Sequence, residues 1–330
     1  MNLYTLPDTL KIFVKPEIFI PQTSGSFMKS IIRNTFDVPV KESLKGVQFK
    51  LSGSTFFFKT ADNSLWIEFN LLRKTVCELE RKGMYERVFG FGRCYNFIDP
   101  EKLNVEMKTV IDEAFTILKR EIAFSKEIFS SIIKAGFDLN LRSEQSTCRL
   151  FWIDVANDYY SNEATERIDN LKYGFKMNNE LNYSYEDDQI RGICAHIRKK
   201  DGKHGAKAFR MYLKNRNIIR YESCFDKKSA GKSFPETNLS DLTIEELKDC
   251  LLPLMNLSKK SFEQIEQDST LEKQLSADIE KYNLLKEILK ILDGNIGKRN
   301  LLHISNLIEH GYIQSRVVQD YRLLRKLKQH

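Results

Sequence analysis

The sequence lacks the features that would place it in a membrane or around a structural metal. No window approaches the roughly 18 consecutive apolar residues that a membrane-spanning helix needs. Residues 1–7 contain no basic segment followed by an apolar run, so we expect no signal peptide and a cytoplasmic protein. The six cysteines show no Cys-x-x-Cys and no Cys/His spacing, which argues against a zinc site or a disulfide framework and for a reducing compartment.

Positive charge is concentrated in one segment of the chain. The 330 residues carry a net charge of +7, yet residues 191–232 alone hold thirteen Lys and Arg against three acidic side chains, a charge of +10. Such a cluster is typical of surfaces that hold a phosphate backbone. A hydrophobic content of 42% supplies enough apolar side chains for two domains or one large one.

The hydrophobic periodicity predicts an α+β fold of antiparallel sheets with packed helices. Alternating apolar and polar residues predict strands at 46–51, 54–59, 64–70 and 148–156. A helical stripe covers 105–135, and a further helix is expected near 162–172. Strands, helix, strand, helix and strands follow one another, which is the order of an α+β protein and not of repeated βαβ units.

The pattern becomes helical after residue 235. We therefore expect an α+β domain over 1–235 that contains the basic segment and binds DNA, with room for two similar halves, 1–140 and 141–235, and an all-helical region over 236–330. An amphipathic helix is predicted over 278–292. The last two predicted helices, 299–309 and 314–328, resemble a helix-turn-helix that exposes Arg316, Arg322 and Arg325. The alternative is a small helical bundle with a solvated basic tail.

The basic segment 191–232 predicts three short strands joined by tight polar turns. Alternation along the second strand places Arg210, Tyr212 and Lys214 on one face, and along the third it places Arg220 beside Glu222. If the register brings Glu222 to the face of Tyr212, a carboxylate lies close to a phenol among cations.

A third polar side chain, Asp154, lies inside an apolar strand, where an unpaired carboxylate is costly to bury. Asp154 and Glu222 would suit Mg²⁺ or Mn²⁺, because these ions prefer oxygen ligands and would polarise a scissile phosphate. The Tyr212 phenol, with an ordinary pKa of ~10, needs such an ion or nearby cations to become nucleophilic. Each residue also has a simpler interpretation. Tyr212 would be an exposed strand tyrosine, Glu222 would pair with Arg210 or Arg220, and Asp154 would cap a turn with Asn157.

Three segments resemble the motifs of replication initiators from rolling-circle plasmids and filamentous phages. They are Arg149-Leu-Phe-Trp-Ile-Asp-Val-Ala-Asn-Asp158, Phe209-Arg-Met-Tyr-Leu-Lys214 and Ile219-Arg-Tyr-Glu222, and the segment 66–74 adds to the likeness. Relatives usually have an aromatic-Gly-Ser step where this chain has Ile193-Cys-Ala-His196. The five histidines form no His-x-His pair, which disfavours nickases of the His-hydrophobe-His class.

The resemblance implies a metal-dependent enzyme that nicks and joins DNA. Tyr212 would attack a phosphodiester and become linked to the 5′-phosphate, leaving a free 3′-OH. Asp154 and Glu222 would be the metal ligands, and Lys214 would contact the phosphate. The alternative is a non-enzymatic DNA-binding regulator in which Tyr212 stacks on a base. A third possibility is an interaction protein whose basic sheet binds an acidic partner.

The expected partners are origin DNA in single-stranded or supercoiled form, a host helicase and a second copy of the chain in a homodimer, with no membrane. The positive charge of the basic segment and of the last helix indicates the side chains that contact DNA. They are Arg198, Lys199, Lys200, Lys203, Lys207, Arg210, Arg216, Arg220, Arg316, Arg322 and Arg325.

Overall fold

The strands in the described part of the chain pair into a single sheet. This computed structural model describes residues 3–86, 97–164, 167–168, 181–183, 192–197, 207–215 and 217–281. The strands are β1 (Leu3–Pro16), β2 (Val40–Ser43), β3 (Gly46–Leu51), β4 (Ser54–Lys59), β5 (Ser64–Asn70), β6 (Ser146–Tyr160), β7 (Leu181–Tyr183), β8 (Gly192–Ile197), β9 (Ala208–Asn215) and β10 (Ile218–Asp226). The helices are α1 (Gly25–Phe36), α2 (Leu71–Arg81), α3 (Met107–Phe137), the single turn α5 (Lys227–Ala230) and α6 (Ile244–Lys281).

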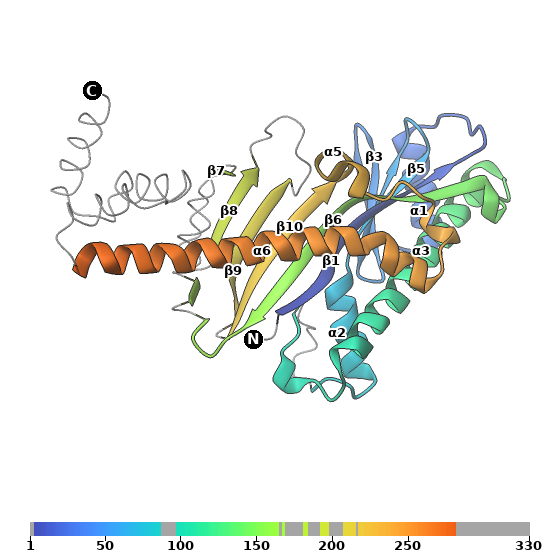
Figure 1. Ribbon diagram of the computed structural model, residues 1–330. Coiled ribbons are helices and arrows are strands. Elements are labelled where there is room, and N and C mark those ends of the chain that lie inside the picture. The colour runs from blue at the N-terminus through green and yellow to red at the C-terminus, as the bar shows by residue number, and fades with distance from the viewer. Residues whose placement is uncertain are drawn as a thin grey trace, which may run out of the picture.

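The sheet has ten strands in the order β2-β3-β4-β5-β1-β6-β10-β9-β8-β7 (Figure 1). Every neighbouring pair is antiparallel, which confirms the predicted α+β class with antiparallel pairing and packed helices. The long strands β1 and β6 lie side by side at the centre. Outward from them the order is β5-β4-β3-β2 on one side and β10-β9-β8-β7 on the other, so the two halves of the sheet have the same arrangement. The predicted domain boundaries stay a prediction.

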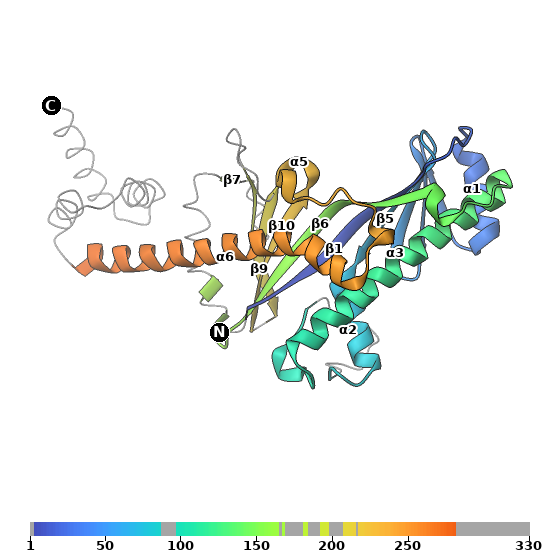
Figure 2. The same cartoon turned by 45° about the vertical axis from the view of Figure 1, so that its right-hand side comes forward.

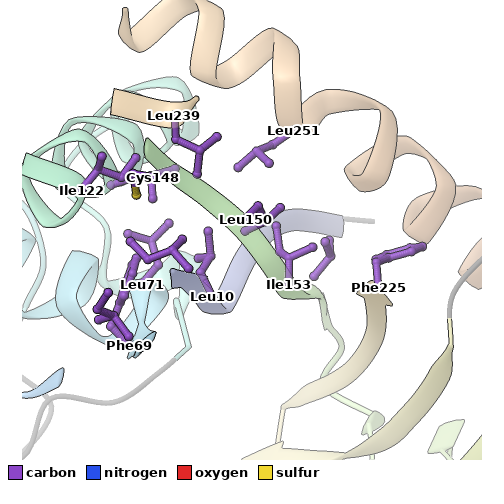
Figure 3. Packing of buried hydrophobic residues seen from close by; sticks show 14 of the residues in the cluster. Leu10, Phe69, Leu71, Ile122, Cys148, Leu150, Ile153, Phe225, Leu239 and Leu251 are labelled. Atoms are coloured by element: carbon purple, nitrogen blue, oxygen red, sulfur yellow. The ribbon is translucent and has the colours of Figure 1, made fainter. Parts of the chain in front are cut away.

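The core forms because alternate residues of each strand are apolar. In β4, Ser54, Phe56 and Phe58 are buried while the residues between them are half-buried. Phe49 of β3 stacks on Phe56 with ring centroids 5.0 Å apart. This face of the sheet packs against the helices, and Figure 3 shows Leu10, Leu150 and Ile153 of the central strands in one cluster with Leu239 and Leu251.

Helices α3 and α6 run across the same face of the sheet (Figures 1 and 2). Buried residues of α6, namely Leu247, Leu251, Leu254 and Phe262, belong to the same core as the strands. A buried polar link adds to this packing, because Asn157 of β6 donates to Ser258 Oγ at 2.6 Å and Ser258 donates to Ser223 Oγ at 2.7 Å.

Most strand predictions are confirmed. The meander at 46–51, 54–59 and 64–70 matches β3, β4 and β5, and the helix over 105–135 is the single helix α3. The pattern did not indicate β1, α1 or α2, and β1 is the central strand of the sheet. Most of the predicted helix over 162–172 lies outside the described residues. So do the end of the predicted helix over 278–292 and the whole expected helix-turn-helix.

Two further expectations concern cysteines and membranes. Cys77 of α2 is disulfide-bonded, so the expectation of a chain without such bonds is wrong at this position. A disulfide requires proximity in space, which sequence spacing does not reveal. Cys148, Cys224 and Cys250 are free thiols. Of the helices in the described ranges, none is long and apolar enough to cross a membrane.

Gly46 begins β3 at a point where the backbone of β4 comes very close. Its φ is +154°, and a Cβ built there would lie 2.0 Å from the carbonyl oxygen of Phe58. Gly53 has a φ of +77°, but a Cβ built there would have no neighbouring atom within 4 Å.

We therefore expect Gly46→Ala to lower the free energy of unfolding by about 2–4 kcal/mol, because the strands must separate locally. Gly53→Ala should cost only about 1 kcal/mol. Urea unfolding of both variants checks this, and equal losses would contradict it.

Candidate functional site on strands β9 and β10

Tyr212 and Glu222 meet on one face of the sheet. The register pairs Arg220 of β10 with Tyr212 of β9 and Glu222 with Arg210, so the two side chains are diagonal neighbours. The Tyr212 hydroxyl donates a hydrogen bond of 2.5 Å to Glu222 Oε1. The predicted site required a register that brings Glu222 to the face of Tyr212, and β9 and β10 pair in such a register.

Two cations flank this hydrogen bond. Lys214 Nζ lies 3.4 Å from the Tyr212 oxygen and 5.2 Å from the centre of its ring. Arg210 Nη1 lies 3.4 Å from the second oxygen of Glu222, and the Arg210 side chain is 46% exposed. Glu222 itself is buried. Its carboxylate therefore links the half-buried phenol of Tyr212 to the exposed cation of Arg210.

Beneath the phenol lies a buried ion cluster of Asp8, Asp158, Arg220 and Glu222. Arg220 donates two hydrogen bonds of 2.6 Å to the two oxygens of Asp158. Its Nη1 lies 3.6 Å from both Asp8 and Glu222. All four residues are almost completely buried. Arg220 is therefore not among the residues that can contact DNA, and that expectation is corrected: its guanidinium balances carboxylates inside the protein.

Burial controls the protonation of this region. It raises the pKa of Tyr212 well above its ordinary value, and the Glu222 carboxylate raises it further. It also raises the pKa of Asp8 to about 7, with Glu222 adding to the rise and Arg220 opposing it. Burial and the charge of Arg220 lower the pKa of Lys214. The resting phenol is therefore protonated and serves as a hydrogen-bond donor.

Asp154 lies on the same face but has different partners. Its Oδ1 accepts a hydrogen bond of 2.6 Å from Trp152 Nε1, and burial raises its pKa. It sits opposite Cys224 on β10, whereas Glu222 sits opposite Ala156. The interpretation of Asp154 as a cap shared with Asn157 is wrong, because Asn157 lies on the other face and donates to Ser258.

A divalent ion such as Mg²⁺ needs carboxylate oxygens that are free to face it. Within the described ranges no group of three or more His, Cys, Asp or Glu side chains is arranged to hold a metal ion. The oxygens of Glu222 face Tyr212, Arg210 and Arg220, and one oxygen of Asp154 is taken by Trp152. That Asp154 and Glu222 hold Mg²⁺ or Mn²⁺ stays a prediction.

Of the other predicted DNA contacts, Lys207 is described and exposed. It pairs with Asp226 at 3.0 Å, and its Nζ lies 4.8 Å from the centre of the Trp152 ring. The remaining predicted contacts lie outside the described residues: Arg198, Lys199, Lys200, Lys203, Arg216, Arg316, Arg322 and Arg325.

Sequence reasoning missed Asp8 and Asp158 as members of the cluster. Asp8 lies in β1 where the pairing with β6 shifts register between Pro7 and Leu10, and Asn70 donates to it at 2.9 Å. The available signal was a Pro-Asp-Thr step inside an otherwise apolar segment, because a buried carboxylate there requires a partner. Its partner, Arg220, comes more than two hundred residues later.

No protein-family model and no curated protein matches this chain. Among solved structures, it is similar to Methanococcus jannaschii TBP, with 12% identity, a TM-score of 0.32 and coverage of 78% of this chain and 98% of the other. It is also similar to a rolling-circle replication initiator protein from Geobacillus stearothermophilus, with 11% identity, a TM-score of 0.29 and coverage of 68% and 75%.

The raised pKa of Asp8 predicts a pH dependence of stability. Because its pKa rises from 3.8 to about 7, the folded chain keeps a proton between these pH values that the unfolded chain has lost. The free energy of unfolding contributed by Asp8 therefore falls as the pH rises through this window. Asp8→Asn should remove the fall and add on the order of 1–4 kcal/mol at pH 8. Urea unfolding from pH 4 to pH 8 measures the difference between the two proteins.

The same change at the exposed Asp37 serves as the control. Asp37 ends α1 in the left-handed conformation, which Asn also adopts readily. Equal slopes of stability against pH for the wild type and Asp8→Asn would contradict the prediction.

Proposed function

We propose that this protein is a DNA-nicking and joining enzyme of the rolling-circle initiator type, with Tyr212 as the nucleophile. The observation that carries the proposal is the 2.5 Å hydrogen bond from the Tyr212 hydroxyl to the buried carboxylate of Glu222, with Lys214 beside the same oxygen. A nucleophile, a proton acceptor within hydrogen-bond reach and a cation for the developing charge are the parts that such a reaction needs.

In the proposed step, Tyr212 Oη forms a bond to the phosphorus and the bond from phosphorus to the 3′-oxygen breaks. The phenol proton passes to Glu222, and the leaving 3′-oxygen takes a proton from water to become a free 3′-OH. The 5′-phosphate stays on the tyrosine, and attack by a 3′-OH reverses the step to join the strand. Glu222 thus acts as the general base in the forward direction and as the acid on return.

The surrounding cations support this chemistry. Lys214 stabilises the negative charge that grows on the phenol oxygen. Arg210, with 46% of its side chain exposed, can reach a phosphate while its other contact holds Glu222 in place. The +10 charge of residues 191–232 supports DNA as the partner, with an affinity that falls as salt rises.

A second candidate function, non-enzymatic DNA binding, is favoured by one observation. Burial and the Glu222 carboxylate both raise the pKa of Tyr212, which opposes the loss of its proton. In this alternative the phenol stays a hydrogen-bond donor and the basic face holds DNA without cutting it.

A covalent adduct distinguishes the two functions. The protein is incubated with supercoiled DNA of its own replicon and with a random pool of single-stranded oligonucleotides, in Mn²⁺ or in EDTA. We expect a denaturant-resistant protein–DNA adduct that carries a 3′-end label but not a 5′-end label, because the tyrosine keeps the 5′-phosphate. Tyr212→Phe should abolish it. An adduct that forms in Mn²⁺ but not in EDTA would support the requirement for a divalent ion that the sequence predicts.

Tyr160→Phe is the matched control. Tyr160 lies on β6 and hydrogen-bonds Glu101, so it is also a tyrosine paired with a carboxylate, but outside the Tyr212 site. This variant should form the adduct at the wild-type rate. No adduct on either DNA, or an adduct that survives Tyr212→Phe, would contradict the proposed function.

Glu222→Gln tests the proton acceptor separately. The amide still accepts a hydrogen bond from Tyr212 but does not take its proton, so the single-turnover rate of adduct formation should fall about 10²–10⁴-fold. DNA affinity should change little, because Glu222 is buried. Quenched-flow kinetics and a binding titration measure the two quantities. An unchanged rate would remove Glu222 from the proton transfer.

A further inference from the structure

Aromatic side chains form a row on the face of the sheet opposite helices α3 and α6. The register places Phe57 of β4, Trp66 of β5 and Phe13 of β1 side by side across three neighbouring strands. Phe13 stacks on Trp66 with ring centroids 5.6 Å apart. Phe151 of β6 packs edge-to-face with Trp66, with ring centroids 4.6 Å apart. We call these four residues the aromatic row.

The aromatic row does not belong to the core. The residues that alternate with it, such as Ile12, Phe56 and Ile67, are buried under the helices, whereas none of the four is part of either apolar cluster in the described ranges. Phe151 is 41% exposed, and the other three are half-buried. A contiguous set of uncovered aromatic rings on a soluble protein usually marks a binding surface.

The charge around the aromatic row favours an anionic occupant. Lys11 and Lys207 lie 6.0 Å and 4.8 Å from the centre of the Trp152 ring, next to the row. Three exposed cations, Lys15, Lys50 and Arg149, have no ion-pair partner among the side chains described. Glu68 of β5 is an acidic residue on this face, and it pairs with Lys11 at 2.9 Å.

We infer that the aromatic row binds single-stranded nucleic acid by stacking its bases on Trp66 and the neighbouring rings. Rings and cations together match the two parts of a single strand, whose base faces are accessible and whose backbone is anionic. A duplex hides its base faces. The row and Tyr212 share one face of the sheet, with β1 and β9 three strand spacings apart, about 14 Å. Along the strands they are further apart, because the register places Tyr212 level with Tyr4, nine residues or about 30 Å from Phe13. The choice of nucleic acid as the ligand rests on the proposed function. Stacking on the aromatic row does not require Tyr212 to cut DNA.

The chain supplies its own reporter, because it contains two tryptophans, Trp66 and Trp152. In a Trp152→Phe protein the remaining tryptophan fluorescence comes from the aromatic row alone. We expect oligo(dT) to quench it on binding, since a stacked base contacts the indole directly. An abasic strand of the same length carries the same charge and should bind without quenching. Duplex DNA should not quench it.

Affinity gives a second measurement. Trp66→Ala should weaken oligo(dT) binding about tenfold, which corresponds to loss of a stacked base. Phe27→Ala is the matched control, because Phe27 is also an exposed aromatic side chain but lies on α1, a helix of the opposite layer. It should bind as the wild type does. Should Trp66→Ala fail to fold, the abasic comparison on the Trp152→Phe protein still decides the question.

The outcomes separate this inference from the proposed function. If oligo(dT) quenches the fluorescence but the protein forms no Tyr212 adduct, the aromatic row is supported as a binding surface and the proposed nicking reaction is rejected. An adduct without quenching, or equal quenching by the abasic strand, would overturn the inference alone. Quenching that depends on protein concentration without DNA would also overturn it, in favour of a second copy of the chain as the occupant.

Discussion

The buried guanidinium of Arg220 determines how the two central parts of the chain fit together. An arginine removed from water requires a carboxylate to balance it, and Arg220 binds Asp158 of β6 while Asp8 of β1 lies 3.6 Å from its Nη1. The two-pronged contact to Asp158 also fixes the direction of the β10 side chains on this face. Glu222, two residues further along β10, is thereby held where its carboxylate meets Tyr212.

The two faces of the sheet have opposite chemistry because each strand alternates. On one face, residues such as Phe209, Tyr221 and Phe225 join the helices in a continuous apolar core. On the other, the same strands present Tyr212, Arg210 and Glu222. The helical layer therefore provides the stability, and it leaves the second face available for polar side chains and for the aromatic row. Near Leu6 and Ala156, residues of α2, of the turn after it and of the start of α3 also pack on this second face.

Local patterns were sufficient for much of the fold and for part of the site. Alternation located β3, β4, β5, β9 and β10, and it placed Tyr212, Lys214 and Glu222 on one side. It missed β1, because Pro7 and Asp8 interrupt the alternation where the strand changes register. The role of Arg220 was also hidden, since a basic residue in a basic segment suggests DNA, and only the three-dimensional pairing reveals two distant carboxylates. For the same reason, the hydrogen bond from Trp152 to Asp154 could not be foreseen from the sequence.

The position of β1 at the centre of the sheet has a consequence for how the protein is made. β1 ends at Pro16, and β6, its neighbour along most of its length, begins at Ser146. At typical rates of synthesis, roughly 6–26 seconds pass on the ribosome before that neighbour begins. During this interval β1 can pair only with β5, and its other edge stays open. Completion of the sheet, and with it the joining of Asp8 to Arg220, must therefore wait for the later half of the chain.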